Sequence, residues 1–195
     1  MTAPQSPAGS EPPPPADVTP ESRAAAGAPP GPFGALPSAA IALVELTEAN
    51  LPDLLEAAVA GADPLEVMPP VSDPPGWTAE RRAAFLAFHR GRALHREHPV
   101  ERTFVITVDG VAVGAARLEP HGEDVEAGMW IGRAHRGLGI GRIVAARLRE
   151  LAAESTARRL TAVTTTDNIP ARRLLEAGTR TRIDRGEVSG SADLT

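Results

Sequence analysis

The 195-residue sequence contains no cysteine, no tyrosine and no lysine, and each absence excludes a kind of chemistry. Without cysteine there can be no disulfide, no thiolate metal site and no cysteine nucleophile. Without lysine, all 20 basic residues are arginine, and a Walker-type phosphate loop is excluded because that loop requires a lysine. Without tyrosine, no phenol can act as a general acid. A reaction in this protein therefore does not proceed through a covalent cysteine intermediate.

Long apolar segments and a positive charge balance are also lacking. No segment is long and apolar enough to span a membrane, and the start of the chain lacks the basic and apolar regions of a signal peptide. The net charge of −5 argues against nucleic acid as a partner. Hydrophobic residues make up 42% and charged residues 23%, which is typical of a globular soluble protein. We expect a cytoplasmic protein without a membrane partner.

Proline, alanine and glycine dominate the first 37 residues. Pro12–Pro15 is a proline run, Pro29–Pro32 has the same character, and few apolar side chains are present to form a core. We therefore predict a disordered tail over residues 1–37 and one domain over residues 38–195.

The rest of the sequence alternates strand and helix patterns. Asp109-Gly110 is a strong hairpin signal between two strand-like runs. Strands are predicted over 41–46, 103–108, 111–119, 125–131, 160–165, 179–184 and 187–194, and helices over 50–60, 78–98, 140–155 and 168–178. Thr78 is predicted to cap the helix that Pro99 ends, and Asp167 or Asn168 is predicted to cap the last helix. In the last helix we expect Ala171, Leu174 and Leu175 to be buried. This order predicts an α/β domain with a mixed, mostly antiparallel twisted sheet and flanking helices.

The most informative stretch is a glycine-rich turn, Arg136-Gly137-Leu138-Gly139-Ile140-Gly141. It lies between the apolar strand pattern Ala127–Ile131 and the amphipathic pattern that begins at Ile140. Glycine lets a ligand approach the backbone closely and adopts positive φ at little cost. The N–H groups that open a helix lack an intrahelical acceptor and carry the positive end of the helix dipole. The turn is therefore predicted to bind an anion, most often a phosphate.

Two motifs in this order resemble those of the GCN5-related N-acetyltransferase (GNAT) superfamily. The turn fits the family's acetyl-CoA loop, Arg/Gln-x-x-Gly-x-Gly/Ala, and Asn168–Gly178 fits its Asn-x-x-Ala/Ser…Gly helix after the fifth strand. The order of elements from Ile41 to the C-terminus also agrees. Residues 126–131 and Arg173–Glu176 look most like the RimJ/RimL-like branch, which acetylates ribosomal-protein N-termini. The resemblance implies the acyl-CoA N-acyltransferase fold.

The resemblance also implies acetyl-CoA as acetyl-donor cosubstrate, and no metal. In this family the loop amides hold the CoA pyrophosphate, the preceding strand pairs with pantetheine, and the asparagine contacts the CoA arm near its thioester. The cofactor-binding residues carried over are Met129, Trp130, Ile131, Arg133, Arg136, Gly137, Leu138, Gly139, Ile140, Gly141, Arg142, Asn168 and Arg173. For Arg133 and Arg142, an ordinary surface position is the alternative to a phosphate contact.

Acetyl transfer to an amine requires a proton acceptor for the ammonium and a hydrogen-bond donor for the thioester oxygen. With no cysteine, the amine is expected to attack directly in a ternary complex. By resemblance, the oxygen's donor is the backbone N–H of Ile131 or its neighbour, and Glu126 and Asn168 are the catalytic residues. Glu126 is the predicted base, since a partly buried glutamate is suited to accept a proton. A solvated carboxylate or an ion pair with an arginine is the alternative interpretation, and Glu119 is the second candidate base.

The general acid is not identified by the sequence. Many family members carry a tyrosine in the helix after the asparagine, and Leu174 stands at that position here. A free thiol has a pKa of about 8.5, so the thiolate can leave near neutral pH, or be met by water, Asn168 or a threonine. His89, His95 and His98 fall on one predicted helix without metal-ligand spacing, and we expect them to face solvent or substrate.

The sequence thus predicts an acetyl-CoA-dependent N-acetyltransferase whose acceptor is a small-molecule amine or a protein N-terminus. A non-catalytic acyl-CoA-binding regulatory domain is the first alternative, and a nucleotide-phosphate binder of another fold is the second. A homodimer that forms along the C-terminal edge of the sheet is a further expectation.

Overall fold

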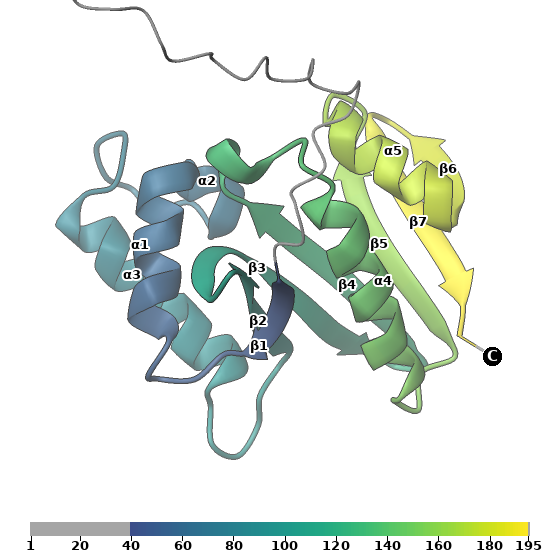
Figure 1. Cartoon of the computed structure of the whole chain (residues 1–195), viewed down its shortest axis with the longest axis horizontal. Helices are drawn as coiled ribbons and strands as arrows, with labels where there is room; N and C mark the ends of the chain where they lie inside the picture. Colours follow the sequence, from purple (N-terminus) through teal and green to yellow (C-terminus); the bar gives the residue numbers. More distant parts are fainter. Residues whose placement is uncertain (1–39, 195) are drawn as a thin grey trace, which may run out of the picture. The chain divides into compact units, whose positions relative to one another are not determined.

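A seven-stranded sheet runs through residues 40–194, the part of the chain that the computed structural model describes (Figure 1). The predicted disordered tail lies outside these residues. The strands are β1 (Ile41–Glu45), β2 (Arg102–Val108), β3 (Val111–His121), β4 (Asp124–Ile131), β5 (Arg159–Thr165), β6 (Arg180–Asp184) and β7 (Glu187–Asp193). Their order in the sheet is β1-β2-β3-β4-β5-β7-β6, and only β4 and β5 are parallel neighbours. The predicted mixed, mostly antiparallel sheet is confirmed.

Five α-helices and one short 3₁₀ helix accompany the strands of the described chain. They are α1 (Leu51–Gly61), α2 (Pro64–Val67), α3 (Ala79–Ala93), η1 (Arg133–His135), α4 (Ile140–Ala153) and α5 (Ile169–Gly178). Thr78 caps α3 as predicted, because its hydroxyl accepts a hydrogen bond from the Arg81 N–H at 3.2 Å. The predicted extension of this helix to His98 is wrong. The helix ends at Ala93, and His95 and His98 lie in the loop that follows. No helix among residues 40–194 is both long enough and apolar enough to cross a membrane.

Two hydrophobic clusters cover the two faces of the sheet. Val105 and Ile106 are neighbours on β2 and point to opposite faces, so each belongs to a different cluster. Val105 packs with α1 and α3, including the fully buried Leu54 and Phe85. Ile106 packs on the other face with α4, including the fully buried Val144. The first three helices and the pair α4 and α5 therefore lie on opposite sides of the sheet.

The sheet divides between β4 and β5. These strands pair over only three positions, of which Glu126 opposite Thr161 is the last. Beyond this point β4 stays paired with β3 as far as Ile131, and β5 stays paired with β7 as far as Thr165. In residues 40–194, Ala127–Ile131 have no strand partner on the side that faces β5. A strand edge with free backbone groups can accept an extended ligand as an added strand.

His89 is buried in the first cluster, which corrects the expectation that it faces solvent or substrate. Its ring lies 4.4 Å from that of Phe85 and 5.2 Å from that of Phe88, and only 4% of the residue is exposed. Neither ring nitrogen has a hydrogen-bond partner within the described residues. Burial lowers the pKa of His89 to about 4, because the nearby charge of Glu101 offsets only part of the cost of desolvating the imidazolium.

The buried imidazole should make the stability of the fold depend on pH. His89 has a lower pKa in the folded chain than in the unfolded chain, so between pH 6.5 and about 4 the unfolded chain binds more protons. The free energy of unfolding should therefore fall by up to about 3 kcal/mol as the pH drops through this window. In His89→Leu that part of the fall should disappear, as measured by urea unfolding at pH 7 and pH 4.5. The exposed His95→Leu is the control, and identical pH dependence in His89→Leu and wild type would contradict the prediction.

Candidate functional site

A cavity of about 720 Å³ opens at the end of β4 where the sheet divides. Its walls come from the last residues of β4, the glycine-rich turn, the first turn of α4 and one side of α5. We call it the cofactor cleft. Of the residues predicted to bind a cofactor, the cleft is lined by Met129, Trp130, Ile131, Arg136, Gly137, Gly139, Ile140, Gly141, Arg142, Asn168 and Arg173. Arg133 and Leu138 do not line it, and Leu138 packs instead against the cluster beneath α4.

The glycine-rich turn presents a series of free backbone donors to the cleft. Within residues 40–194, no hydrogen bond is found for the N–H groups of Gly137, Gly139, Ile140 and Gly141, and all four residues line the cleft. Gly137 and Gly139 have φ of +77° and +82°, a left-handed conformation that side-chain-bearing residues rarely adopt. Gly139 is also the residue that caps α4, so the positive end of the helix dipole faces the same space. This arrangement suits a multiply charged anion such as a pyrophosphate.

Glu66 on α2 was not identified from the sequence, but it lines the cleft. Its carboxylate accepts hydrogen bonds from Arg136 at 2.9 Å and from Arg133 at 3.3 Å. The hydrogen bond from Arg136 lowers the pKa of Glu66, because its effect and the arginine charges outweigh partial burial. The pairing joins α2 to Arg133 of η1, 67 residues away in sequence, and to Arg136 of the glycine-rich turn, 70 residues away. No local sequence pattern indicates a contact at such a separation.

Asn168 and α5 form the opposite wall of the cleft. The side-chain oxygen of Asn168, Oδ1, accepts a hydrogen bond from the Ala171 N–H at 3.3 Å and caps α5, as predicted. The expectation that Ala171, Leu174 and Leu175 are buried is wrong, because α5 contains no fully buried residue. Their apolar side chains line cavities and do not pack against a filled core. The helix therefore keeps an apolar surface available to a ligand.

Glu126, the predicted base, is not on the wall of the cleft. By strand alternation it shares a face of β4 with Trp130, which packs towards α1 and α3. Its carboxylate accepts a hydrogen bond from Arg117 at 2.5 Å, so the ion pair considered from the sequence is present. Arg117 lies across Gly128, where an added Cβ would be 2.9 Å from its Nε. Glu126 therefore stands where the strands begin to separate, on the face away from α4 and α5.

Arg117 belongs to a larger charged cluster on this face. It also donates to Glu119 at 2.5 Å, and Arg92 binds both Glu119 and the buried Glu101, at 2.6 and 2.7 Å. Burial alone would raise the pKa of Glu119, but the hydrogen bond and charge of Arg92, with Arg117, hold that pKa below its ordinary value. A carboxylate held in its charged form by two arginines is a weak proton acceptor. Glu119 is paired with two arginines and Glu126 with one, so the cluster weakens Glu119 more than Glu126 as a candidate base.

Other ionisable groups do not assemble into a metal centre in the described chain. No group of three or more histidine, aspartate or glutamate side chains is placed to hold a metal ion there. His135 also lines the cleft, next to Arg136 in the chain, although no sequence pattern indicated it. The polar groups that line the cleft include backbone donors, arginines, Glu66, His135 and Asn168.

Comparison with known proteins agrees with this geometry. The family model described as the acetyltransferase (GNAT) family matches residues 65–178, which is more than half of the chain. No curated protein sequence matches significantly. The matched segment begins in α2 and ends with α5, so it contains the cleft, the glycine-rich turn and Asn168.

Several solved structures share the fold at low sequence identity. RimL, a ribosomal L7/L12 alpha-N-protein acetyltransferase in complex with coenzyme A, is 15% identical, with a TM-score of 0.60 over 78% of this chain and 93% of that one. A dodecameric spermidine N-acetyltransferase from Vibrio cholerae is 15% identical, with a TM-score of 0.59 over 79% and 94%. A putative acetyltransferase from Salmonella typhimurium, solved with its cofactor acetyl-CoA, is 18% identical, with a TM-score of 0.55 over 80% and 94%. Together, the family match and the sheet that divides beside a glycine-rich turn show that this chain belongs to the GNAT acetyltransferase family.

Proposed function

We propose that this N-acetyltransferase transfers the acetyl group of acetyl-CoA to a primary amine by direct attack in a ternary complex. The observation that carries the proposal is the set of four N–H groups, at Gly137, Gly139, Ile140 and Gly141, that have no partner in the described chain and lie at the open end of the divided sheet. These donors suit the CoA pyrophosphate, and the unpaired edge of β4 suits the amide-bearing pantetheine arm. The Nδ2 group of Asn168 remains free to donate to the ligand, because only its oxygen is used to cap α5.

The acceptor amine is proposed to approach from the face that carries Glu126. A thioester held along β4 beyond Glu126 would lie in the gap between β4 and β5, so both faces of the sheet could reach it. Glu126 would take the ammonium proton directly or through water, and the backbone N–H of Ile131 or its neighbour would stabilise the developing oxyanion. The acceptor is a small-molecule amine or a protein N-terminus.

The proposal can be tested by thiol release. The full chain is incubated with acetyl-CoA and a panel of polyamines, amino sugars, amino acids and peptides with free N-termini, and a thiol reagent follows free CoA. Because the chain has no cysteine, the enzyme itself does not react with the reagent. Thiol release that depends on one class of acceptor is the expected result. Calorimetric binding of acetyl-CoA without acceptor-dependent release would contradict catalysis and favour the regulatory binding domain.

Glu66→Gln should tighten the binding of CoA. In the free protein the Glu66 carboxylate accepts a hydrogen bond from Arg136, one of the arginines that line the cleft. A phosphate must compete with this carboxylate, and two partly exposed ion pairs should cost the ligand about threefold to tenfold in affinity. Calorimetry with CoA on wild type and Glu66→Gln checks the prediction, with the exposed Glu56→Gln as control. A higher Kd for CoA in Glu66→Gln would show that the carboxylate holds the binding site in place and does not compete with the phosphate for Arg136.

A further inference from the structure

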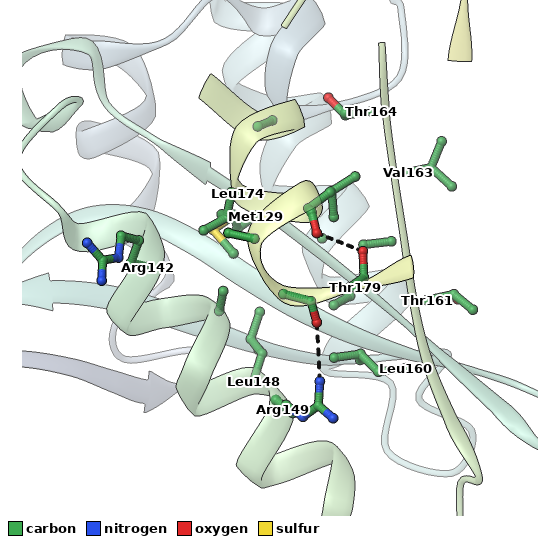
Figure 2. Close-up of a pocket in the computed structure, with 18 of the residues that line it drawn as sticks. Met129, Arg142, Leu148, Arg149, Leu160, Thr161, Val163, Thr164, Leu174 and Thr179 are labelled. Carbon is green, nitrogen blue, oxygen red and sulfur yellow. Dashed lines mark hydrogen bonds between the residues drawn. The ribbon is translucent and has the colours of Figure 1, made fainter. Parts of the chain in front are cut away.

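We infer that the enzyme accepts acyl groups longer than acetyl, because a second, apolar cavity continues from the thioester end of the cofactor cleft. This inference rests on the proposed function. The cavity has a volume of about 490 Å³ and lies between α4, α5 and β5 (Figure 2). We call it the acyl cavity. Its volume falls in the range of small-ligand sites, which is about 300–1,000 Å³.

The two cavities adjoin where the thioester is expected. Met129, Asn168 and Leu174 line both of them. Met129 is on the unpaired edge of β4, Asn168 begins α5, and Leu174 stands where many relatives have a tyrosine. Met129 and Leu174 are both labelled among the lining side chains in Figure 2. An acyl chain that extends from a thioester between Met129 and Asn168 would therefore meet an apolar wall at Leu174.

The lining of the acyl cavity is suited to hydrocarbon. Leu148 of α4 and Leu160 of β5 are both buried and line it from the core side. Small side chains, Ala145 on α4 and Ala162 on β5, leave the space between the elements unfilled. A cavity lined by leucine and alanine holds an apolar ligand without the cost of desolvating polar groups.

Three polar side chains around the acyl cavity already donate hydrogen bonds within the protein. Arg149 donates to the carbonyl oxygens of Gly178 at 3.4 Å and Asp193 at 3.0 Å, and the Thr179 hydroxyl donates to that of Leu175 at 2.8 Å. Dashed lines in Figure 2 mark the bonds from Arg149 to Gly178 and from Thr179 to Leu175. The Thr161 hydroxyl donates to the carbonyl oxygen of Val125 at 3.4 Å. The other polar residues of the lining include Arg142 and Asn168, which stand at the boundary with the cofactor cleft, and Thr164 near the end of β5. The part of the cavity between α4 and β5 therefore favours a saturated acyl chain over a sugar or a charged group.

The reaction itself is unchanged by the longer donor. The bond between the acyl carbonyl carbon and sulfur breaks, the same carbon forms a bond to the amine nitrogen, the amine loses one proton, and CoA leaves as the thiol or thiolate. Only the remainder of the acyl chain differs, and it occupies the acyl cavity in every step.

A donor series from acetyl-CoA through butanoyl-, hexanoyl- and octanoyl-CoA tests the inference, with a fixed acceptor and thiol release as readout. Up to about fourfold higher kcat/KM is expected for each buried methylene until the cavity is full. Calorimetry of the same donors without acceptor gives a readout that does not depend on turnover. A decline in both kcat/KM and affinity from the first added methylene would overturn the inference.

Two variants fill the cavity from different sides. Ala145→Leu and Ala162→Leu line the acyl cavity but not the cofactor cleft, so each should abolish the preference for long chains and retain acetyl transfer. The exposed Ala153→Leu, on the same helix as Ala145, is the matched control. Long-chain activity that survives both cavity-filling variants would overturn the inference. Tighter binding of longer donors with no turnover of any donor would support the cavity and contradict the proposed catalysis.

Discussion

Replacing Glu126 with glutamine should lower kcat/KM for acetyl transfer by about 10²- to 10⁴-fold, the range typical of a lost general base. Glutamine keeps an oxygen that can accept the hydrogen bond from Arg117, so the geometry of the strand junction should survive. What it removes is the group that deprotonates the acceptor ammonium, so that the neutral amine can attack the thioester. Binding of acetyl-CoA, measured by calorimetry, should stay close to wild type, because Glu126 does not line the cofactor cleft.

Two comparisons make the Glu126 result specific. Glu123→Gln removes a nearby exposed carboxylate that pairs with Arg158 and should have little effect on kcat/KM. Glu119→Gln tests the second candidate, and we expect a smaller loss because two arginines already engage that carboxylate. If Glu126→Gln left both kcat/KM and its pH profile unchanged while Glu119→Gln abolished activity, the base would be Glu119.

Gly139→Val should raise the Kd for acetyl-CoA by about 10²- to 10³-fold. Gly139 has φ of +82°, and a β-branched residue there would force the turn into another conformation. The free N–H groups of residues 137 and 139–141 would then no longer point together at one anion. Each charge-assisted hydrogen bond contributes about 1.5–3 kcal/mol, so loss of two of them accounts for an effect of this size.

The matched control for Gly139→Val is Gly110→Val. Gly110 has the same φ of +82°, nothing lies within 4 Å of an added Cβ at either residue, and Gly110 is in the hairpin between β2 and β3. Both variants should lose a similar amount of unfolding free energy, measured by urea denaturation. Only Gly139→Val should lose acetyl-CoA binding. Equal Kd values for the two variants would show that backbone strain, and not the phosphate site, had been measured.

Local patterns predicted most of the fold because they depend on neighbouring residues. Asp109-Gly110 specified the hairpin, and in the structure Asp109 and Gly110 both have positive φ, as a tight two-residue turn requires. Thr78 and Asn168 specified helix starts, because each carries a side-chain oxygen that satisfies a free backbone N–H. The end of α3 was less predictable. Leu94–His98 continue the helical pattern weakly, and Pro99 was the predicted end of the helix. In the structure the helix ends at Ala93.

Contacts between distant segments account for what the sequence did not predict. Glu66 reaches the glycine-rich turn only because α2 is placed beside it by the folded chain. His89 follows the same helical pattern as exposed residues, and its burial depends on how α3 packs in the folded chain, where the ring lies against Phe85 and Phe88 of the same helix. Leu174 and Leu175 of α5 are apolar residues at helical spacing, and this pattern predicts that they are buried in a core, but in the structure they are only partly buried. The sequence pattern cannot distinguish a helix side that meets a core from one that lines a cavity.

The narrow junction between β4 and β5 has a consequence for how the domain unfolds. In the described chain, β4 and β5 pair at only three positions, and this ladder joins the first four strands to β5, β7 and β6. The helix that covers this second half, α5, contains no fully buried residue. Further coupling comes from the core beneath α4, which includes Leu160 of β5, and the C-terminal half, with the fewest buried side chains on its helix, is expected to open first when no ligand is bound. A ligand that pairs with β4 and packs under α5 would join the halves as an additional strand. The cosubstrate would then be a structural element of the enzyme, and its arrival would add to the coupling between the two halves of the domain.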